Sequence, residues 1–160
     1  MSEVNKAALE SLVRQVLLEK LGGAPAAPGG KAVAHGVRAV PVPRVEVTQA
    51  DRMDTGRSGD RVWTRDLFSL AEAPRLGCGL MVMEDTTFPW KLTYDEMDYV
   101  IEGRLDILVG GETVSAGPGE VLHIPRGSEI QFSVRGRARF LYFVYRADGQ
   151  SRGGGQGPWL

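Results

Sequence analysis

The strongest constraint on the fold is a run of short apolar segments, separated by glycine-containing turns, between residues 60 and 146. Several segments alternate apolar and polar positions, as half-buried β-strands do. No helical pattern interrupts them, and Gly110-Gly111 between two apolar segments is a hairpin signal. The region therefore predicts an all-β domain, either a sandwich or a barrel. The expected strands are residues 61–66, 79–84, 98–101, 105–109, 121–124, 129–134 and 139–145.

Composition and charge exclude several kinds of partner. The chain of 160 residues has a net charge of -1, which gives it no basic excess for nucleic acid or an anionic membrane. No apolar run approaches the roughly 20 residues of a membrane-spanning helix, and the N-terminus lacks a secretory signal. Cys78 is the single cysteine, so no intramolecular disulfide can form. We expect a cytoplasmic protein in which Cys78 is a buried thiol.

The N-terminal part of the chain predicts a helix on a flexible tether. Residues 3–21 repeat apolar side chains at helical spacing, and Gly22-Gly23 supplies a stop. Such a helix is marginal in water by itself, so its apolar side needs a partner. Docking on the barrel is one option, but the long Pro/Gly/Ala linker favours a separate partner. The expected organisation is an amphipathic helix in residues 1–22, a linker in 23–44, one barrel domain in 45–148 with its core in 60–146, and a flexible Gly-rich tail in 149–160.

Two strings in the strand region resemble the sequence signatures of cupins, which are small jelly-roll β-barrels. In the first, Glu96 is followed after six residues by Gly103. In the second, Gly119 is followed after five residues by Pro125-x-Gly127. The resemblance implies a single small cupin barrel. A core of fewer than 90 residues is thin, and cupins of this size commonly bury an outer sheet face against a second copy, so we expect a homodimer.

The histidines that bind metal in many cupins are missing. Two would precede the glutamate, where this chain has Trp90 and Leu92, or Pro89 and Lys91 with one more spacer residue. A third would follow the Pro-x-Gly turn, where the chain has Ile130. We therefore do not expect Zn²⁺, Fe²⁺ or Mn²⁺ bound in the usual histidine-rich manner, nor any tightly bound cofactor.

A more specific resemblance covers roughly residues 60–150. Residues 88–103, 124–128 and 139–142 are similar to the ethanolamine utilisation protein EutQ family, most strongly at Pro89-Trp90 and in the Tyr94-to-Asp98 string. The resemblance implies acetate kinase activity, which exchanges phosphate between ATP and acetate. It also implies a bacterial microcompartment, a protein-shelled organelle for ethanolamine or related aldehyde metabolism.

The N-terminus departs from the long N-terminal region of that family. A short amphipathic helix on a linker resembles instead the encapsulation peptides that carry cargo into microcompartments. This second resemblance implies that residues 3–21 contact shell or cargo proteins, and that the protein lies within or attached to a microcompartment in the cytoplasm.

Strand alternation identifies the candidate site. Glu96 matches the family position that points into the barrel, so Asp98, two residues further on, should point inward too. Two inward carboxylates are costly unless they are paired, hydrogen-bonded or protonated. They could form a satisfied structural network, or serve acid–base chemistry or a Mg²⁺ ion that arrives with ATP.

The neighbouring residues complete the expected site. Tyr94 and Asp95 are expected at the mouth side of the strand, where they would orient the acceptor, so the candidate catalytic residues are these two with Glu96 and Asp98. The candidate substrate-binding residues are Lys91, Trp90, Gln131 and Tyr142, with Lys91 or an arginine such as Arg104 near phosphates.

Three functions fit these features. The first is a small phosphotransferase of the acetate kinase type. The second is a non-catalytic assembly or binding protein that docks on shell or cargo through its helix. The third is a sensor, or a cupin enzyme of unassigned activity, that uses the acidic pocket for a small acidic or phosphorylated metabolite.

Overall fold

The computed structural model describes residues 34–69 and 71–145. The predicted helix in residues 3–21, the tail in residues 149–160 and half of the predicted linker, residues 23–33, lie outside these residues. The chain divides into two compact units between residues 41 and 42. Of the first unit the structure describes residues 34–41, which include the 3₁₀ helix η1 (Ala34–Gly36). All the named strands lie in the second unit.

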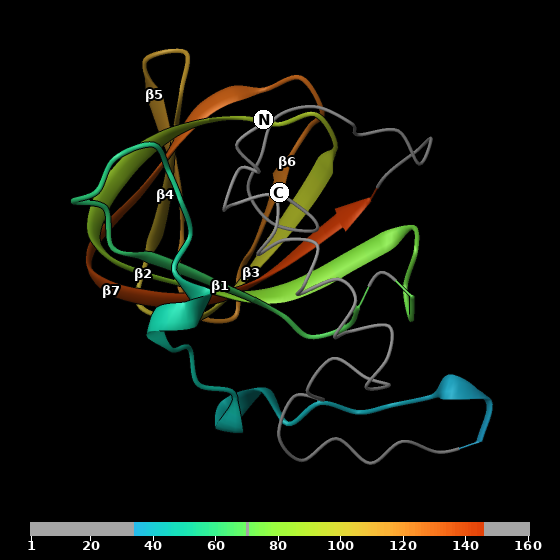
Figure 1. The fold of residues 1–160 in the computed structure, drawn as a ribbon. Coiled ribbons are helices and arrows are strands. Elements are labelled where there is room, and N and C mark those ends of the chain that lie inside the picture. The colour runs from blue at the N-terminus through green and yellow to red at the C-terminus, as the bar shows by residue number, and fades with distance from the viewer. Residues whose placement is uncertain (1–33, 70, 146–160) are drawn as a thin grey trace, which may run out of the picture. The chain divides into compact units, whose positions relative to one another are not determined.

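The second unit is one antiparallel sheet that curves into a barrel, as the strand pattern predicts (Figure 1). Its strands follow the order β1-β2-β7-β3-β6, and β4 pairs with both β5 and β7. The 3₁₀ helices η2 (Val42–Arg44) and η3 (Gln49–Asp51) precede the first strand. The strands are β1 (Val62–Asp66), β2 (Leu76–Lys91), β3 (Asp95–Glu102), β4 (Leu105–Val109), β5 (Glu112–Ala116), β6 (Val121–Ile124) and β7 (Glu129–Tyr145).

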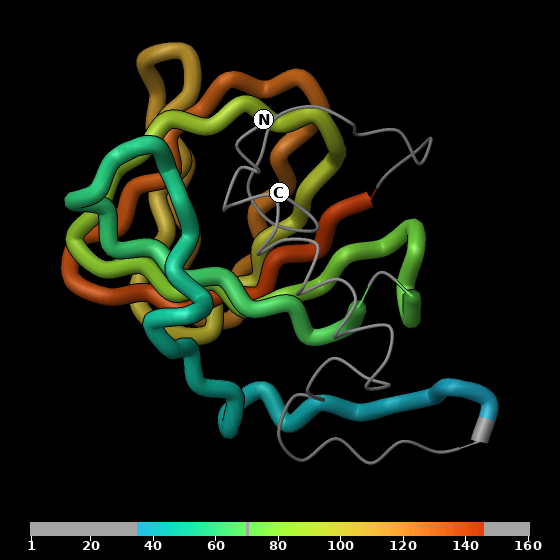
Figure 2. The backbone as a smooth tube through the Cα atoms, in the orientation of Figure 1, coloured from blue at the N-terminus to red at the C-terminus, as the bar shows by residue number. Residues whose placement is uncertain are grey.

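The two long strands β2 and β7 pair along most of their length and bend together around the barrel (Figure 2). The bend lies at a bulge, where the register shifts between Glu84 and Thr86. At the bulge Asp85 and Gly136 both have positive φ angles, of 40° and 73°, and the Gly136 N–H donates to Asp85 Oδ1 at 2.6 Å. On the two sides of the bulge β7 has different second partners: its first half pairs with β4 and its second half pairs with β3. The prediction of two strands, 129–134 and 139–145, was therefore wrong, because the glycine between them is a bulge within one strand.

The remaining strands agree with the sequence pattern to different degrees. The predicted bounds of β4 and β6 are confirmed at both ends. β3 begins three residues before the predicted start at residue 98, and β2 extends the predicted segment 79–84 at both ends. β5 had no apolar alternation to reveal it, because among the described strands it pairs with β4 alone, and it exposes all but its last residue.

The core consists of the inward-facing side chains of the curved sheet. The rings of Phe88 and Phe132 stack with centroids 5.4 Å apart, and Trp90 meets Phe88 edge-on at 6.0 Å. Cys78 is a buried free thiol, as predicted, and burial raises its pKa to about 11. Within the described ranges, no helix has the length and apolar character needed to cross a bilayer.

Candidate functional site

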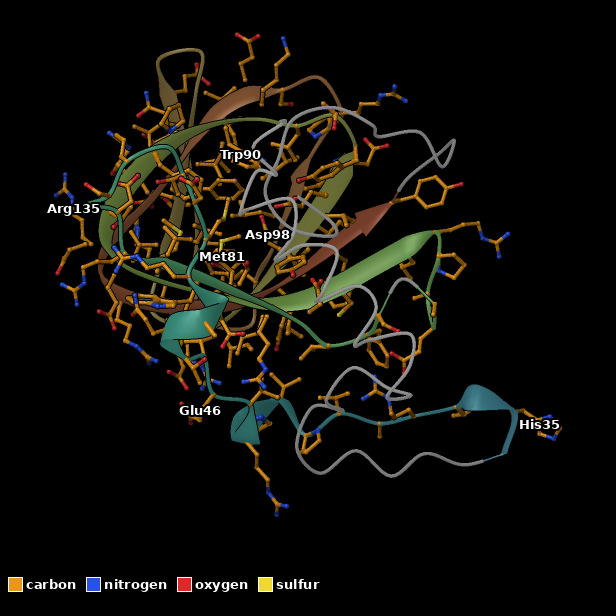
Figure 3. All side chains as sticks on the ribbon, in the orientation of Figure 1. His35, Glu46, Met81, Trp90, Asp98 and Arg135 are labelled. Carbon is orange, nitrogen blue, oxygen red and sulfur yellow. The ribbon has the colours of Figure 1, made fainter. Side chains whose placement is uncertain are left out.

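Strand β3 turns two carboxyl groups into the barrel. Glu96 and Asp98 are 1% and 0% exposed, whereas Met97 and Tyr99 between and beyond them are 51% and 39% exposed. The inward orientation that alternation predicts for both acids is therefore confirmed. Figure 3 shows Asp98 within the ring of strands together with Trp90 and Met81.

The two carboxyl groups receive no hydrogen bond from any other residue in the described part of the chain. Among the described residues, none donates a hydrogen bond to any of the four carboxyl oxygens of Glu96 and Asp98. The bond that remains open to them is with each other, and it requires one carboxyl to be protonated. Burial raises the pKa of Asp98 to about 7. Burial, and then the charge of Asp98, raise the pKa of Glu96 well above its usual range. The pair therefore holds a proton at neutral pH unless a cation replaces it.

A row of cross-strand neighbours runs from this carboxyl pair on β3 to a third acidic residue, Asp66, on β1. Asp66 on β1 lies opposite Gly79 on β2, Gly79 lies opposite Tyr142 on β7, and Tyr142 lies opposite Asp98 on β3. The Tyr142 hydroxyl donates to Asp66 Oδ1 at 2.5 Å. Burial raises the pKa of Asp66, and this hydrogen bond opposes the rise. Burial, followed by the charge of Asp66, raises the pKa of the Tyr142 hydroxyl.

Gly79 makes this arrangement possible. A Cβ atom at this position would lie 2.0 Å from the Tyr142 hydroxyl oxygen and 2.1 Å from the ring carbon that carries it. The end of the tyrosine ring therefore lies directly over the glycine backbone. Any larger residue would push the hydroxyl away from Asp66.

The residues predicted around the pair are divided between the interior and the surface. Tyr94 is buried at 7% exposure in the core cluster that surrounds the interior, and Trp90 packs against that cluster. Tyr142 is buried at 1% exposure. Asp95 is exposed, and its Oδ1 accepts a hydrogen bond from the backbone N–H of Arg126 at 3.0 Å. Asp95 therefore fixes the turn after β6.

Lys91 and Gln131, two of the predicted substrate-binding residues, lie outside the interior, so the structure does not bring them beside the acidic pair. Lys91 is exposed, and its Nζ pairs with Glu129 Oε1 at 2.7 Å. Gln131 is exposed and lines a surface pocket of about 380 Å³ beside the β4–β5 turn. On β2 Lys91 lies an odd number of positions from the inward-facing Phe88, and on β7 Gln131 follows the inward-facing Ile130. Because side chains alternate between the two faces of a strand, both residues point outward.

Arg104 is also a surface residue. Its Nε lies 2.8 Å from Asp106 Oδ1, and its guanidinium donates to Ser115. This contact places the arginine in the β4–β5 hairpin and not beside the acidic pair. The expectation of a phosphate-binding cation at Lys91 or Arg104 is therefore not met by the interior.

Sequence reasoning missed Asp66. The hydrogen bond to Tyr142 joins residues 76 positions apart, and it depends on β1 pairing with β2. The available signal was an acidic residue at the end of an otherwise half-apolar segment. That signal does not identify a partner without the strand order.

The donor set excludes one type of metal centre and suits another. The positions of the cupin histidines are occupied by Leu92 and Ile130, which are buried and apolar, and by Trp90. In the described part of the chain no group of three or more His, Cys, Asp or Glu side chains could hold a metal ion. A transition-metal centre of the cupin type therefore does not fit. Mg²⁺ commonly takes one or two carboxylates and completes its shell with water and substrate phosphates, and the four unpartnered oxygens fit that need.

Comparison with known proteins gives a consistent result. The family model of the ethanolamine utilisation protein EutQ matches residues 4–151. The chain is 49% identical over 154 residues to the acetate kinase EutQ of Clostridioides difficile (strain 630), covering 94% of this chain and 98% of that protein. It is 41% identical over 86 residues to the acetate kinase EutQ of Salmonella typhimurium, of whose length the match covers 38%.

Solved structures agree. The Clostridium difficile EutQ protein superimposes with a TM-score of 0.74 at 50% identity, covering 78% of this chain and 99% of that chain. A putative ethanolamine utilization protein Q from Salmonella typhimurium LT2 gives a TM-score of 0.66 at 32% identity, covering 75% of this chain and 94% of that chain. The match in sequence spans the barrel and most of the segment before it. The chain is a member of the EutQ family of ethanolamine utilisation proteins.

Proposed function

We propose that this chain is an acetate kinase, which transfers phosphate between ATP and acetate. The observation that carries the proposal is its 49% identity to an acetate kinase EutQ across 98% of that protein's length. The unpartnered carboxyl pair in the barrel supports it, because phosphoryl transfer depends on charge neutralisation, which a carboxylate-bound Mg²⁺ supplies.

The described residues suggest distinct roles. Glu96 and Asp98 would hold Mg²⁺, which neutralises phosphate charge when bound. The buried aromatic side chains of Tyr94 and Tyr142, with Trp90 beside them, would shape the space for a small acceptor such as acetate. Asp95 would act indirectly, by holding the Pro-x-Gly turn through its bond to Arg126. We assign no surface arginine or lysine to the nucleotide.

Turnover by the purified full-length chain tests the proposal. The assay incubates it with acetate and Mg·ATP and follows acetyl phosphate by ³¹P NMR. We expect Glu96→Gln and Asp98→Asn each to lower kcat/KM by about 100-fold or more, because each replaces a carboxylate ligand with a neutral amide, which binds Mg²⁺ far more weakly. Glu112→Gln, the same change on the exposed strand β5, should keep full activity.

Two outcomes would count against different parts of the proposal. Absence of acetyl phosphate with the wild-type chain would remove the kinase activity and favour a non-catalytic binding protein. Full turnover by both folded interior variants would retain the activity but move the site away from the carboxyl pair.

We also propose that the protein associates with a microcompartment through residues 3–21. The helical spacing of apolar residues in that segment and the family's place in ethanolamine utilisation support this location. Deletion of residues 1–23 should abolish co-purification with microcompartment shells while the barrel stays folded. Undiminished co-purification of the truncated chain would contradict the proposed role of the helix.

A further inference from the structure

We infer that Asp66 is a positioning residue for the interior cation site, because it holds the Tyr142 hydroxyl away from Glu96 and Asp98. The inference rests on the metal site in the proposed function. It assigns a role to Asp66 and Gly79, neither of which contributes to the carboxyl pair itself.

The Tyr142 side chain leans toward β2 and away from the carboxyl pair. Strand β7 lies between β2 on one side and β3 on the other. The ring end of Tyr142 lies over Gly79 on β2, and its hydroxyl reaches Asp66 on β1. The side chain is therefore turned away from β3, although Asp98 on β3 is its direct cross-strand neighbour.

The carboxyl pair receives no hydrogen bond from this tyrosine. The four carboxyl oxygens of Glu96 and Asp98 accept no hydrogen bond from any other described residue. This is so even though Tyr142, which has a buried hydroxyl, lies on the adjacent strand directly opposite Asp98. A buried hydroxyl needs an acceptor, and Asp66 supplies it. As long as Asp66 takes this hydrogen bond, the oxygens of the pair are left available to a cation.

Loss of the Asp66 acceptor should redirect the tyrosine. The hydroxyl would become a buried donor without a partner, which is unfavourable, and on the other side of β7 the direct cross-strand neighbour of Tyr142 is Asp98, which offers a carboxyl acceptor. A hydroxyl that donates to Asp98 competes with a metal ion for the same oxygen. Asp66 would thus control cation affinity without touching the cation.

Direct metal binding tests this inference without relying on turnover. Mn²⁺ alone serves as the probe, because it prefers oxygen ligands in an octahedral arrangement as Mg²⁺ does, and its binding to the full-length chain is followed by EPR. Asp66→Ala should weaken Mn²⁺ binding about tenfold, the size of one hydrogen bond to a charged group. Asp66→Asn should stay within about twofold of wild type, because its amide oxygen still accepts the hydroxyl.

The double variant gives the decisive comparison. D66A/Y142F lacks the competing hydroxyl, so its Mn²⁺ affinity should return to within about twofold of wild type. Tyr142→Phe alone should bind Mn²⁺ at least as tightly as wild type, a result that does not depend on whether D66A folds. Glu112→Gln serves as the unaffected surface control.

The failures of the two proposals differ. If wild-type chain binds no Mn²⁺, or binds it equally after Glu96→Gln, the metal site is wrong and this inference is overturned with it. If wild type binds Mn²⁺ through the pair but D66A binds equally well, only the role of Asp66 is overturned. Weak binding by D66A that Tyr142→Phe does not restore, or weak binding by Tyr142→Phe itself, would likewise overturn that role.

Discussion

Asp98 is fully buried, and its ionisation is the residue-scale property with the clearest consequence for stability. Burial raises its pKa from 3.8 in the reference state to about 7 in the folded chain. A carboxyl with a higher pKa when folded binds more protons in the native than in the unfolded state. The contribution of this carboxyl to the free energy of unfolding is therefore largest below about pH 4, and it decreases as the pH rises toward 7.

We predict that Asp98→Asn reduces the decrease in the free energy of unfolding between pH 4 and pH 8. At pH 8 the variant should be more stable than wild type, by on the order of 1–3 kcal/mol, and the difference should shrink toward pH 4. Urea unfolding from pH 4 to 8 measures it, with Glu112→Gln expected to follow wild type. Parallel wild-type and Asp98→Asn curves across this range would show that the carboxyl ionises without cost in the folded chain.

Gly79 has a steric role that can be separated from the general effect of a glycine. Alanine at this position places a Cβ atom 2.0 Å from the Tyr142 hydroxyl, so we expect Gly79→Ala to lower the free energy of unfolding by about 1–3 kcal/mol. Gly59, which has no atom within 4 Å of an added Cβ, provides the matched control, and Gly59→Ala should change stability little. Equal melting temperatures for the two variants would argue against close packing of Tyr142 on β2.

The sequence predicts the part of the candidate site that lies within one strand, but not the contacts that depend on how the strands pair. Alternation within β3 predicts that Glu96 and Asp98 share a buried face, because that depends on local geometry alone. Lys91 was expected near the phosphates, but it lies on β2, where it is on the opposite face from the inward-facing Phe88 and points outward. Asp66 could not be found at all, since its contact with Tyr142 depends on which strands pair.

At the scale of elements, the bulge between β2 and β7 is the feature that lets two long strands serve both halves of the barrel. Asp85 adopts a φ of 40°, which is unfavourable for a residue with a Cβ, and accepts the Gly136 N–H. Asp85→Ala keeps the backbone strain and loses the hydrogen bond, so it should lower the free energy of unfolding by about 1–2 kcal/mol. Asp85→Gly loses the bond but relieves the strain, so chemical denaturation should place it between Asp85→Ala and wild type. A glycine variant less stable than the alanine variant would contradict this explanation.

The same bulge explains how far the elements could be predicted. Short strands that end at ordinary turns, such as β4 and β6, have bounds that the sequence pattern marks correctly. Gly136 looks like a turn residue in sequence, yet it continues β7, because the partner strand supplies Asp85 to satisfy its N–H. Strand β5 is held by its pairing with β4 and buries only its last residue. It therefore has no buried face that an apolar alternation in the sequence could indicate.

At the scale of the whole molecule, the outer face of β3, β6 and β7 carries a group of exposed apolar side chains, with the exposed His123 beside it. Met97, Tyr99 and Val121 are 51%, 39% and 59% exposed, and they lie beside the half-buried Leu141 and Phe143. We name these five residues the outer patch. None carries a formal charge, which suits contact with an identical copy, because a patch near a two-fold axis meets itself and any charge would face its like. The outer patch is therefore our proposed surface for the expected homodimer.

The dimer prediction can be tested by placing a charge at the most exposed position of the outer patch. Val121→Lys puts two ammonium groups near each other across the proposed axis, so it should weaken self-association on the order of 100-fold. Sedimentation velocity at micromolar concentration should then show a dimer for wild type and a monomer for the variant. Val109→Lys, at the tip of the β4–β5 hairpin and 39% exposed as valine, is the matched change outside the patch and should remain dimeric. A wild-type monomer, or dimers of equal strength in both variants, would contradict the outer patch as the contact between copies.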